Sequence, residues 1–176
     1  MADYIKIKTP KAADAVKCGL YRTTKELGPA VPAGVLVYYH NHGDPGPGVY
    51  PPEKWINNKA VFSMRGIPLK NLNDAFTLEP LPSEGFYRVT KDFYCCENHC
   101  RLIVRDTLVQ LGYNGKGEPI VFIPEWNDDG VSLPERGTLL DEERLNYLKP
   151  LKLTFNFSNK NHSDAPEPVE EEPAEE

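Results

Sequence analysis

The sequence predicts a mainly β protein made of two tandem copies of one small domain, and three observations support this. A segment near residue 20 recurs near residue 86, the apolar runs are short and bounded by turn residues, and 17 prolines and 13 glycines are spread along the 176 residues. Frequent Pro and Gly favour short strands joined by turns over long helices. The fold prediction therefore depends on the repeat and on the length of the apolar runs.

The repeat is clearest where Gly19-Leu-Tyr-Arg-Thr-Thr-Lys-Glu26 aligns with Gly85-Phe-Tyr-Arg-Val-Thr-Lys-Asp92, with five identical positions of eight. Without a gap, this register carries Val35–Tyr38 onto Arg101–Val104. A five-residue insertion around Gly112–Gly117 then brings further pairs together: Trp55 with Trp126, Arg65-Gly66 with Arg136-Gly137, Leu69 with Leu140, and Leu78–Leu81 with Leu148–Leu151. Ordered matches separated by turn residues are typical of a duplicated domain.

The repeat sets the domain boundaries. We expect a leader over residues 1–17, a first copy over 18–81, a second copy over 84–151, a terminal strand over 152–158 and a disordered acidic tail over 159–176. The linker Pro82-Ser83 is short, so the two lobes should lie in contact or nearly so. The tail has no core-forming residues and is rich in Glu and Pro, a composition that does not support a packed core.

The elements follow from the pattern within each copy. The leader offers an edge strand over 4–8 and one or two helical turns over 10–17. Strands are expected over 19–24, 34–40, 60–64 and 76–78, then over 86–90, 102–110, 120–123 and 151–157, the last from strict alternation of apolar and polar residues. Residues 140–148 predict a short helix with acids in its first turn, which suits the helix dipole, and 69–78 predict a weaker one or a 3₁₀ segment.

Together, short strands, a long early loop and a short helical turn before the last strand resemble an SH3-like small β-barrel over residues 18–151. The resemblance implies two SH3-like barrels in tandem, and an OB-like or open five-stranded barrel is the alternative. A domain of this size buries only about 60% of the surface of its unfolded chain. Packing of the lobes on each other would therefore stabilise both.

The charge distribution limits the classes of partner. From Asn159 onward the chain has seven acids and one base, which accounts for the whole net charge of −6 and leaves the body neutral. A nucleic-acid partner is not favoured, because phosphate-backbone binding needs a basic excess. The sequence has neither a secretory signal nor a membrane-spanning apolar run. Four cysteines form no obvious disulfide framework, so we expect a reducing, cytoplasmic location.

Two clusters could hold a metal. Cys95, Cys96, His99 and Cys100 offer enough ligands for a tetrahedral zinc site. Adjacent thiols, and a ligand-free aligned segment over 29–34, favour instead a loop of reduced cysteines, with zinc or redox chemistry as the alternative. His40 and His42, with Asp44, could chelate a metal from a strand end, although a solvated hairpin tip is the preferred interpretation.

Aromatic residues are the favoured partner-binding candidates, because Tyr and Trp often anchor interfaces. They are Tyr21, Tyr38, Tyr39, Trp55, Tyr87 and Trp126. Tyr38 and Tyr39 are adjacent on a strand, so one of them must point outward. For Trp55 and Trp126 a core position is preferred over a groove position. Gly66 and Gly137 are expected to supply a positive φ in a turn.

The search for catalytic motifs is negative for nucleophile elbows, zinc-protease signatures and phosphate-binding glycine loops. We therefore expect a non-enzymatic protein-binding or scaffolding module that needs no cofactor. The alternative is a self-assembling structural component of a larger assembly, such as a virus particle or secretion apparatus. A second alternative is a zinc-binding or redox protein that uses the Cys95–Cys100 loop.

Overall fold

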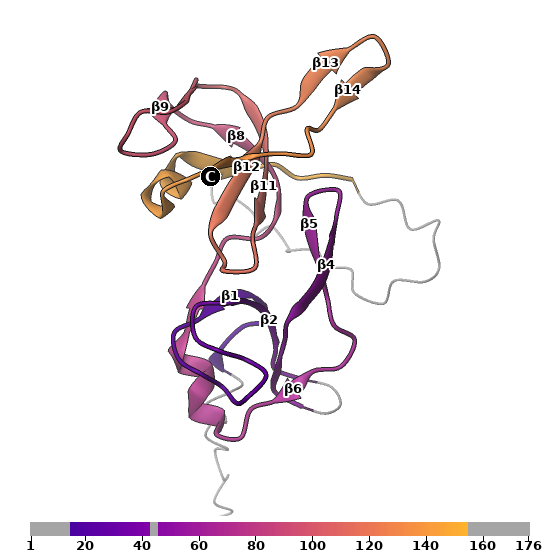
Figure 1. The fold of residues 1–176 in the computed structure, drawn as a ribbon, viewed down its shortest axis with the longest axis vertical. Coiled ribbons are helices and arrows are strands. Elements are labelled where there is room, and N and C mark those ends of the chain that lie inside the picture. Colours follow the sequence, from indigo (N-terminus) through magenta and orange to yellow (C-terminus); the bar gives the residue numbers. More distant parts are fainter. Residues whose placement is uncertain (1–14, 43–45, 155–176) are drawn as a thin grey trace, which may run out of the picture.

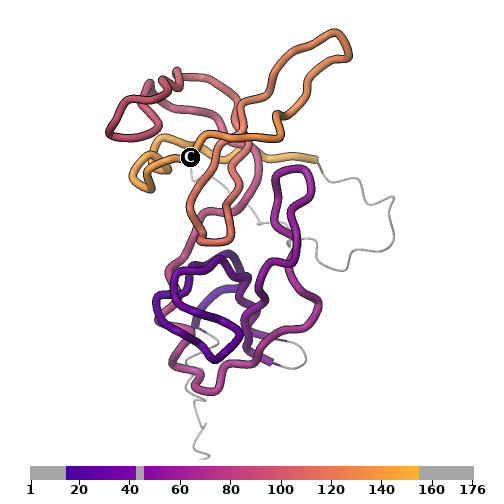
Figure 2. Tube along the Cα trace, viewed as in Figure 1, coloured from indigo at the N-terminus to yellow at the C-terminus, as the bar shows by residue number. Residues whose placement is uncertain are grey.

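The computed structural model describes residues 15–42 and 46–154, which form a mainly β protein of several small sheets (Figures 1 and 2). The predicted fold class is therefore confirmed at this level. The predicted strand over 4–8, nearly all of the helical turns over 10–17 and the acidic tail lie outside the described residues. No helix in the described part of the chain is long and apolar enough to span a membrane.

The first lobe contains one five-stranded antiparallel sheet in the order β6-β3-β2-β1-β7. A two-stranded hairpin, β4–β5, and a 3₁₀ helix, η2, are inserted between its strands. The bounds are β1 Gly19–Thr23, β2 Leu36–His40, β3 Gly48–Tyr50, β4 Pro52–Ile56, β5 Lys59–Phe62, β6 Ile67–Pro68, η2 Leu72–Thr77 and β7 Leu78–Pro80.

The second lobe contains a five-stranded antiparallel sheet in the order β15-β12-β11-β8-β16. It has two inserted hairpins, β9–β10 and β13–β14, and the 3₁₀ helix η3. The bounds are β8 Gly85–Val89, β9 Phe93–Tyr94, β10 Leu102–Ile103, β11 Leu108–Tyr113, β12 Pro119–Phe122, β13 Glu125–Asn127, β14 Gly130–Ser132, β15 Thr138–Leu139, η3 Glu142–Tyr147 and β16 Leu148–Pro150.

The two sheets have the same strand order, and their pairings define corresponding positions. Tyr21 lies opposite Val37 on one neighbouring strand and Pro80 on the other. Tyr87 lies opposite Val109 and Pro150 in the same way. Both tyrosine hydroxyls donate to a backbone carbonyl four residues earlier, over 2.8 Å and 2.7 Å. Neither sheet closes into a barrel through strand pairing among the described residues.

These pairings correct the predicted position of the insertion. Gly34 and Asp106 correspond, because both have a positive φ and donate their N–H to the last residue of β1 or β8, Thr23 and Val89 respectively. The insertion therefore lies in the connection between β8 and β11, residues 90–107, and not around Gly112–Gly117. Hairpin β9–β10, which carries the cysteine loop, is formed from this longer connection.

Other predicted elements need smaller corrections. Both predicted helices are present, as the 3₁₀ segments η2 and η3. The strand expected over 76–78 begins only at Leu78. The strand expected over 151–157 is wrong in its described part: the last strand is β16, and residues 151–154 have no regular structure. Pro150 is the last paired residue of β16, opposite Tyr87, and one further backbone hydrogen bond follows it, from the Leu151 N–H to the Phe86 carbonyl over 2.9 Å.

Gly66 and Gly137 do not have the predicted role of supplying a positive φ in a turn. Neither has a positive φ. A Cβ on Gly66 would lie 2.4 Å from the Tyr50 ring, and one on Gly137 would lie 2.4 Å from Ile120 and 2.9 Å from the Phe122 ring. Glycine is therefore required for close approach to neighbouring side chains, which is its second common use in sheets.

The lobes lie in contact, as the short linker predicts, and one of the two apolar cores crosses between them. Leu20, Leu36 and Ala60 of the first lobe belong to the same buried cluster as Val89 and Val109 of the second. The other cluster lies within the first lobe, around Val37, Tyr39 and Val49. Arg22 adds a polar link, since its guanidinium pairs with Glu79 of its own lobe and Glu142 of the other.

Candidate functional site

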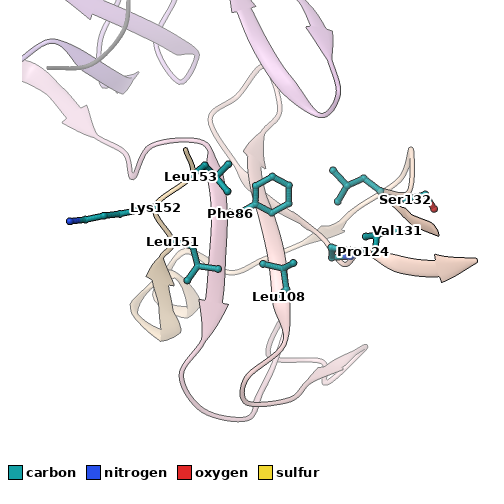
Figure 3. Close-up of a pocket in the computed structure, with 9 residues that line it drawn as sticks. Phe86, Leu108, Pro124, Val131, Ser132, Leu151, Lys152 and Leu153 are labelled. Atoms are coloured by element: carbon teal, nitrogen blue, oxygen red, sulfur yellow. The ribbon is translucent and has the colours of Figure 1, made fainter. Parts of the chain in front are cut away.

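An apolar groove of about 550 Å³ lies on the second lobe, and we call it the second-lobe groove. Figure 3 shows side chains from β8, β11, β14 and the segment after β16 converging on it. Phe86 lies between Leu153 and Leu108, while Lys152 points away from the other side chains (Figure 3). The apolar side chains that line the groove are Phe86, Leu108, Pro124, Val131, Leu133, Leu151 and Leu153.

The corresponding surface of the first lobe is covered. Leu36 corresponds to Leu108, because they lie opposite Arg22 and Arg88 at the same place in the two sheets. Leu36 is fully buried, whereas Leu108 is 42% exposed. The difference arises from the second lobe, whose β11–β12 turn lies against the first lobe (Figure 1) and whose Tyr113 joins the cluster that buries Leu36.

Two hydrogen bonds from the first lobe hold this turn in place. The Trp55 indole N–H donates to the Tyr113 carbonyl over 2.7 Å, and the Leu36 backbone N–H donates to the Gly115 carbonyl over 3.0 Å. A Cβ on Gly117 would lie 3.4 Å from Arg22 and from Leu81, so the turn passes close to the sheet. The first lobe therefore binds a glycine-rich β-turn through one indole, one strand N–H and apolar contacts.

The second lobe has the same donor in Trp126, and in the described part of the chain no turn lies against it. Trp126 lies opposite Val131 in hairpin β13–β14, as Trp55 lies opposite Ala60 in β4–β5. Directly paired residues project from the same face of a hairpin, so Trp126 is on the side of Val131, which lines the groove. Trp126 is 84% exposed and Trp55 is 43% exposed. The predicted core position is therefore wrong for both tryptophans, because their hairpins lie outside the five-stranded sheets.

The tyrosines are distributed differently from the tryptophans. Tyr21, Tyr39 and Tyr87 are buried, and Tyr21 packs edge-on against Tyr39 with ring centroids 5.9 Å apart. Burial raises the pKa of Tyr21 and of Tyr87. Tyr38 is the outward residue of the adjacent pair, and it packs half-buried on Phe62 at 5.7 Å. None of these four rings lines the second-lobe groove.

The predicted cysteine cluster is partly assembled. The sulfurs of Cys95 and Cys96 are 3.6 Å apart, while the His99 ring packs on Tyr94 with centroids 4.3 Å apart. Hydrogen bonds from the backbone and thiol of Cys100 lower the pKa of Cys96, and burial raises the pKa of Cys95. Cys96 is thus the thiol of this loop that is most readily ionised, and a metal or redox use of the loop stays a prediction.

His40 and His42 approach each other, with ring centroids 4.0 Å apart. Their third neighbour is Cys18, and the potential ligand atoms of the three residues all lie within 4.8 Å of one another. The sequence prediction of a chelating His-x-His pair included Asp44, which lies outside the described residues. It did not include Cys18, because only the pairing of β1 with β2 brings that residue beside the histidines.

Sequence reasoning also did not identify the residues of the second-lobe groove. The repeat aligns Leu151 with Leu81, yet sequence alignment alone cannot show that one lobe covers the other. No family model, curated protein or solved structure matches this chain. The arguments about function therefore depend on the geometry of the two lobes.

Proposed function

We propose that this chain is a non-enzymatic protein-binding or scaffolding module, formed by duplication of one SH3-like domain, and that the second-lobe groove binds its partner. One observation carries the proposal: the surface that corresponds to the groove in the first lobe is already occupied by a polypeptide turn. The shared strand order of the two five-stranded sheets supports the duplication. SH3-like domains commonly bind peptides on aromatic-lined surfaces.

The contacts in the first lobe indicate the chemistry of the partner. The bound turn offers two backbone carbonyls and passes close to the sheet at Gly117. A partner for the second-lobe groove should likewise present a glycine-containing β-turn flanked by apolar side chains. The indole N–H of Trp126 would donate to a carbonyl of that turn. Apolar contacts with Leu108 and Val131, which is 59% exposed, would supply most of the affinity.

A cyclised peptide of residues 111–119, which copies the bound turn, provides a defined probe. We expect the peptide to shift backbone amide NMR signals of residues lining the second-lobe groove. Leu108→Asp should weaken binding at least tenfold, because burying one leucine contributes about 1.5 to 3 kcal/mol. Leu139→Asp is the matched control, since Leu139 is a similarly exposed leucine of the same lobe that does not line the groove.

Equal binding by the two variants, or signal shifts confined to other surfaces, would contradict the proposal. Both side chains are about half exposed, so neither variant should unfold the lobe. Urea unfolding of both proteins before the titration checks this expectation.

The second candidate function is a structural component of a larger assembly. The observation in its favour is that the turn which fills the first-lobe surface comes from this same chain. A second copy of the chain could then supply a turn to the open groove. Sedimentation of the wild type and the same two variants separates the candidates. Concentration-dependent oligomers lost only in Leu108→Asp support assembly, and a monomer at all concentrations supports binding of another protein.

A further inference from the structure

We propose that Cys18, His40 and His42 bind a single zinc ion at the open end of the β1–β2 pair. Their candidate ligand atoms, one sulfur and two imidazole nitrogens, all lie within 4.8 Å of one another. Thiolate and imidazole are the ligands that Zn²⁺ prefers in proteins. This site is separate from the second-lobe groove and from the Cys95–Cys100 loop, and it does not depend on the proposed function.

Strand pairing explains why these three residues meet. Gly19 lies opposite Tyr39, so Cys18, one residue earlier, lies opposite His40, one residue later. Opposite residues of an antiparallel pair project from the same face, with Cβ atoms about 4.5 to 5.5 Å apart. His42 follows two residues after His40, and its ring lies 4.0 Å from the His40 ring, centroid to centroid. The backbone therefore places three ligands together before any metal is bound.

The separations suit a tetrahedral ion after a small adjustment. With Zn–S near 2.3 Å and Zn–N near 2.0 to 2.1 Å, tetrahedral ligand atoms are roughly 3.3 to 3.6 Å apart. Because no pair is more than 4.8 Å apart, binding requires any pair to close by no more than about 1.5 Å. His42 is exposed, so its side chain can rotate towards the ion. Cys18 and His40 are half-buried, so their positions are more fixed. Three protein ligands leave the fourth position to a water molecule.

Asn41 is not one of the three proposed ligands, but it contacts the Cys18 ligand through hydrogen bonds and so belongs to the outer shell of the site. Its backbone N–H donates to the Cys18 sulfur over 3.3 Å, and its side-chain amide nitrogen donates to the Val16 carbonyl over 2.8 Å. In the metal-free protein the Cys18 thiol also donates to the Asn41 amide oxygen over 3.1 Å. Zinc binding displaces the thiol proton, so this last bond is lost while the N–H contact to the resulting thiolate is retained. Asn41 is thus a positioning residue for the sulfur.

Cobalt is the probe, because a thiolate bound to Co²⁺ gives a ligand-to-metal charge-transfer band and four-coordinate Co²⁺ gives intense visible bands. We expect the full-length reduced protein to develop both sets of bands with one equivalent of Co²⁺ and to lose them on addition of one equivalent of Zn²⁺.

Variants of the proposed site identify the ligands. Cys18→Ser should abolish the charge-transfer band. His42→Ala, at an exposed position, should lower Co²⁺ affinity without changing the unfolding midpoint of the metal-free protein. Asn41→Ala should weaken binding about 10- to 100-fold, as loss of an outer-shell partner does.

The remaining thiols supply the control. Cys96→Ser/Cys100→Ser leaves the buried Cys95 in place and should keep the full cobalt spectrum. A spectrum that survives Cys18→Ser and disappears in the double variant would assign the metal to the cysteine loop and overturn the proposal. Absence of a thiolate–cobalt band in the wild type would overturn it equally.

Discussion

Gly137 shows how tightly a single position can be constrained in a small sheet. A methyl group at this position would lie 2.4 Å from the Ile120 side chain and 2.8 Å from the Val121 carbonyl oxygen. The carbonyl belongs to strand β12, which pairs with β11 on one side and β15 on the other, so it cannot move independently of the sheet. At the corresponding Gly66 the three atoms nearest to the methyl group would all belong to the Tyr50 side chain, which is half-buried and can shift.

We therefore expect Gly137→Ala to lower the free energy of unfolding by about 1 to 3 kcal/mol, the usual cost of overpacking. Gly66→Ala should cost less. Gly19→Ala is the control, because a Cβ there would have only one neighbour within 4 Å, at 3.9 Å, and it should change stability by less than about 0.5 kcal/mol. Urea titration of the three variants gives the order, and equal losses at positions 19 and 137 would argue against close packing as the cause.

Residue identity alone predicted some positions well and others poorly. The alternation of a strand correctly requires that only one of Tyr38 and Tyr39 be buried. It could not predict that Trp55 and Trp126, the same residue at corresponding positions, differ in exposure by about twofold. That difference depends on which lobe lies beside each hairpin, and a local sequence pattern does not show which distant segment packs against it.

Hairpin β4–β5 is the element that joins the lobes. Its two turn residues, Asn57 and Asn58, both have positive φ, at 51° and 64°, as a two-residue type I′ turn requires. The Asn57 carbonyl accepts from the Gln110 amide over 2.9 Å, and the Asn58 amide donates to the Pro134 carbonyl over 3.1 Å. Gln110 is 92% buried beneath this contact. The tip of the hairpin therefore completes the surface of β11.

A substitution at Gly112 tests the contact between the tip of hairpin β4–β5 and strand β11. A Cβ at Gly112 would lie 2.4 Å from the Asn58 carbonyl oxygen, so Gly112→Ala must displace the hairpin tip. We expect a loss of about 1 to 3 kcal/mol in unfolding free energy. We also expect faster hydrogen exchange in β4–β5, while hairpin β13–β14, whose residues are not among the nearest neighbours of a Cβ at Gly112, keeps its wild-type rate. Exchange that increases equally in both hairpins would mean that the change acts on the whole second lobe and not on the junction.

At the scale of elements the sequence predicted β1, β2, β5, β8 and β12 to within two residues, because short apolar runs between turn residues have few other structures available. It joined β10 and β11 into one strand over 102–110, and it did not predict the short strands β3, β4, β6, β9, β13, β14 and β15. The insertion was misplaced because the glycine-rich segment 112–117 has strong turn chemistry. The extra residues instead lie in 90–107, where hairpin β9–β10 gives them regular structure. Turn residues mark where a chain can turn, and they do not show which of several turns has been lengthened.

Glu84 couples the stability of the whole molecule to pH. Its carboxylate, at the start of the second lobe, accepts the Ala60 backbone N–H of hairpin β4–β5 over 3.1 Å. Burial at this junction raises the pKa of Glu84 from 4.5 to about 7, although the Ala60 hydrogen bond partly opposes the shift. Between these two pKa values the folded protein binds more protons than the unfolded chain. The contribution of Glu84 to stability therefore falls as pH rises from about 4.5 to 7.

We expect the free energy of unfolding to decrease over this interval by up to about 3 kcal/mol and to have no further contribution from Glu84 above pH 7. Glu84→Gln keeps an acceptor oxygen for Ala60 but cannot ionise. The variant should gain stability relative to the wild type as pH rises from 5 to 8. Urea unfolding at both pH values measures the difference, and a constant difference between the two proteins would contradict a titrating Glu84.

The unequal covering of the two lobes gives the molecule a polarity. Its first lobe has its apolar surface occupied from within the chain, and among residues 15–42 and 46–154 nothing covers the equivalent surface of its second lobe. Contacts that copy the internal one would run in one direction only, from the turn of one unit to the groove of the next. Such heterologous contacts generate open chains or rings and not two-fold dimers. Any growing array of this protein would therefore have two chemically distinct ends, one of which presents Trp126.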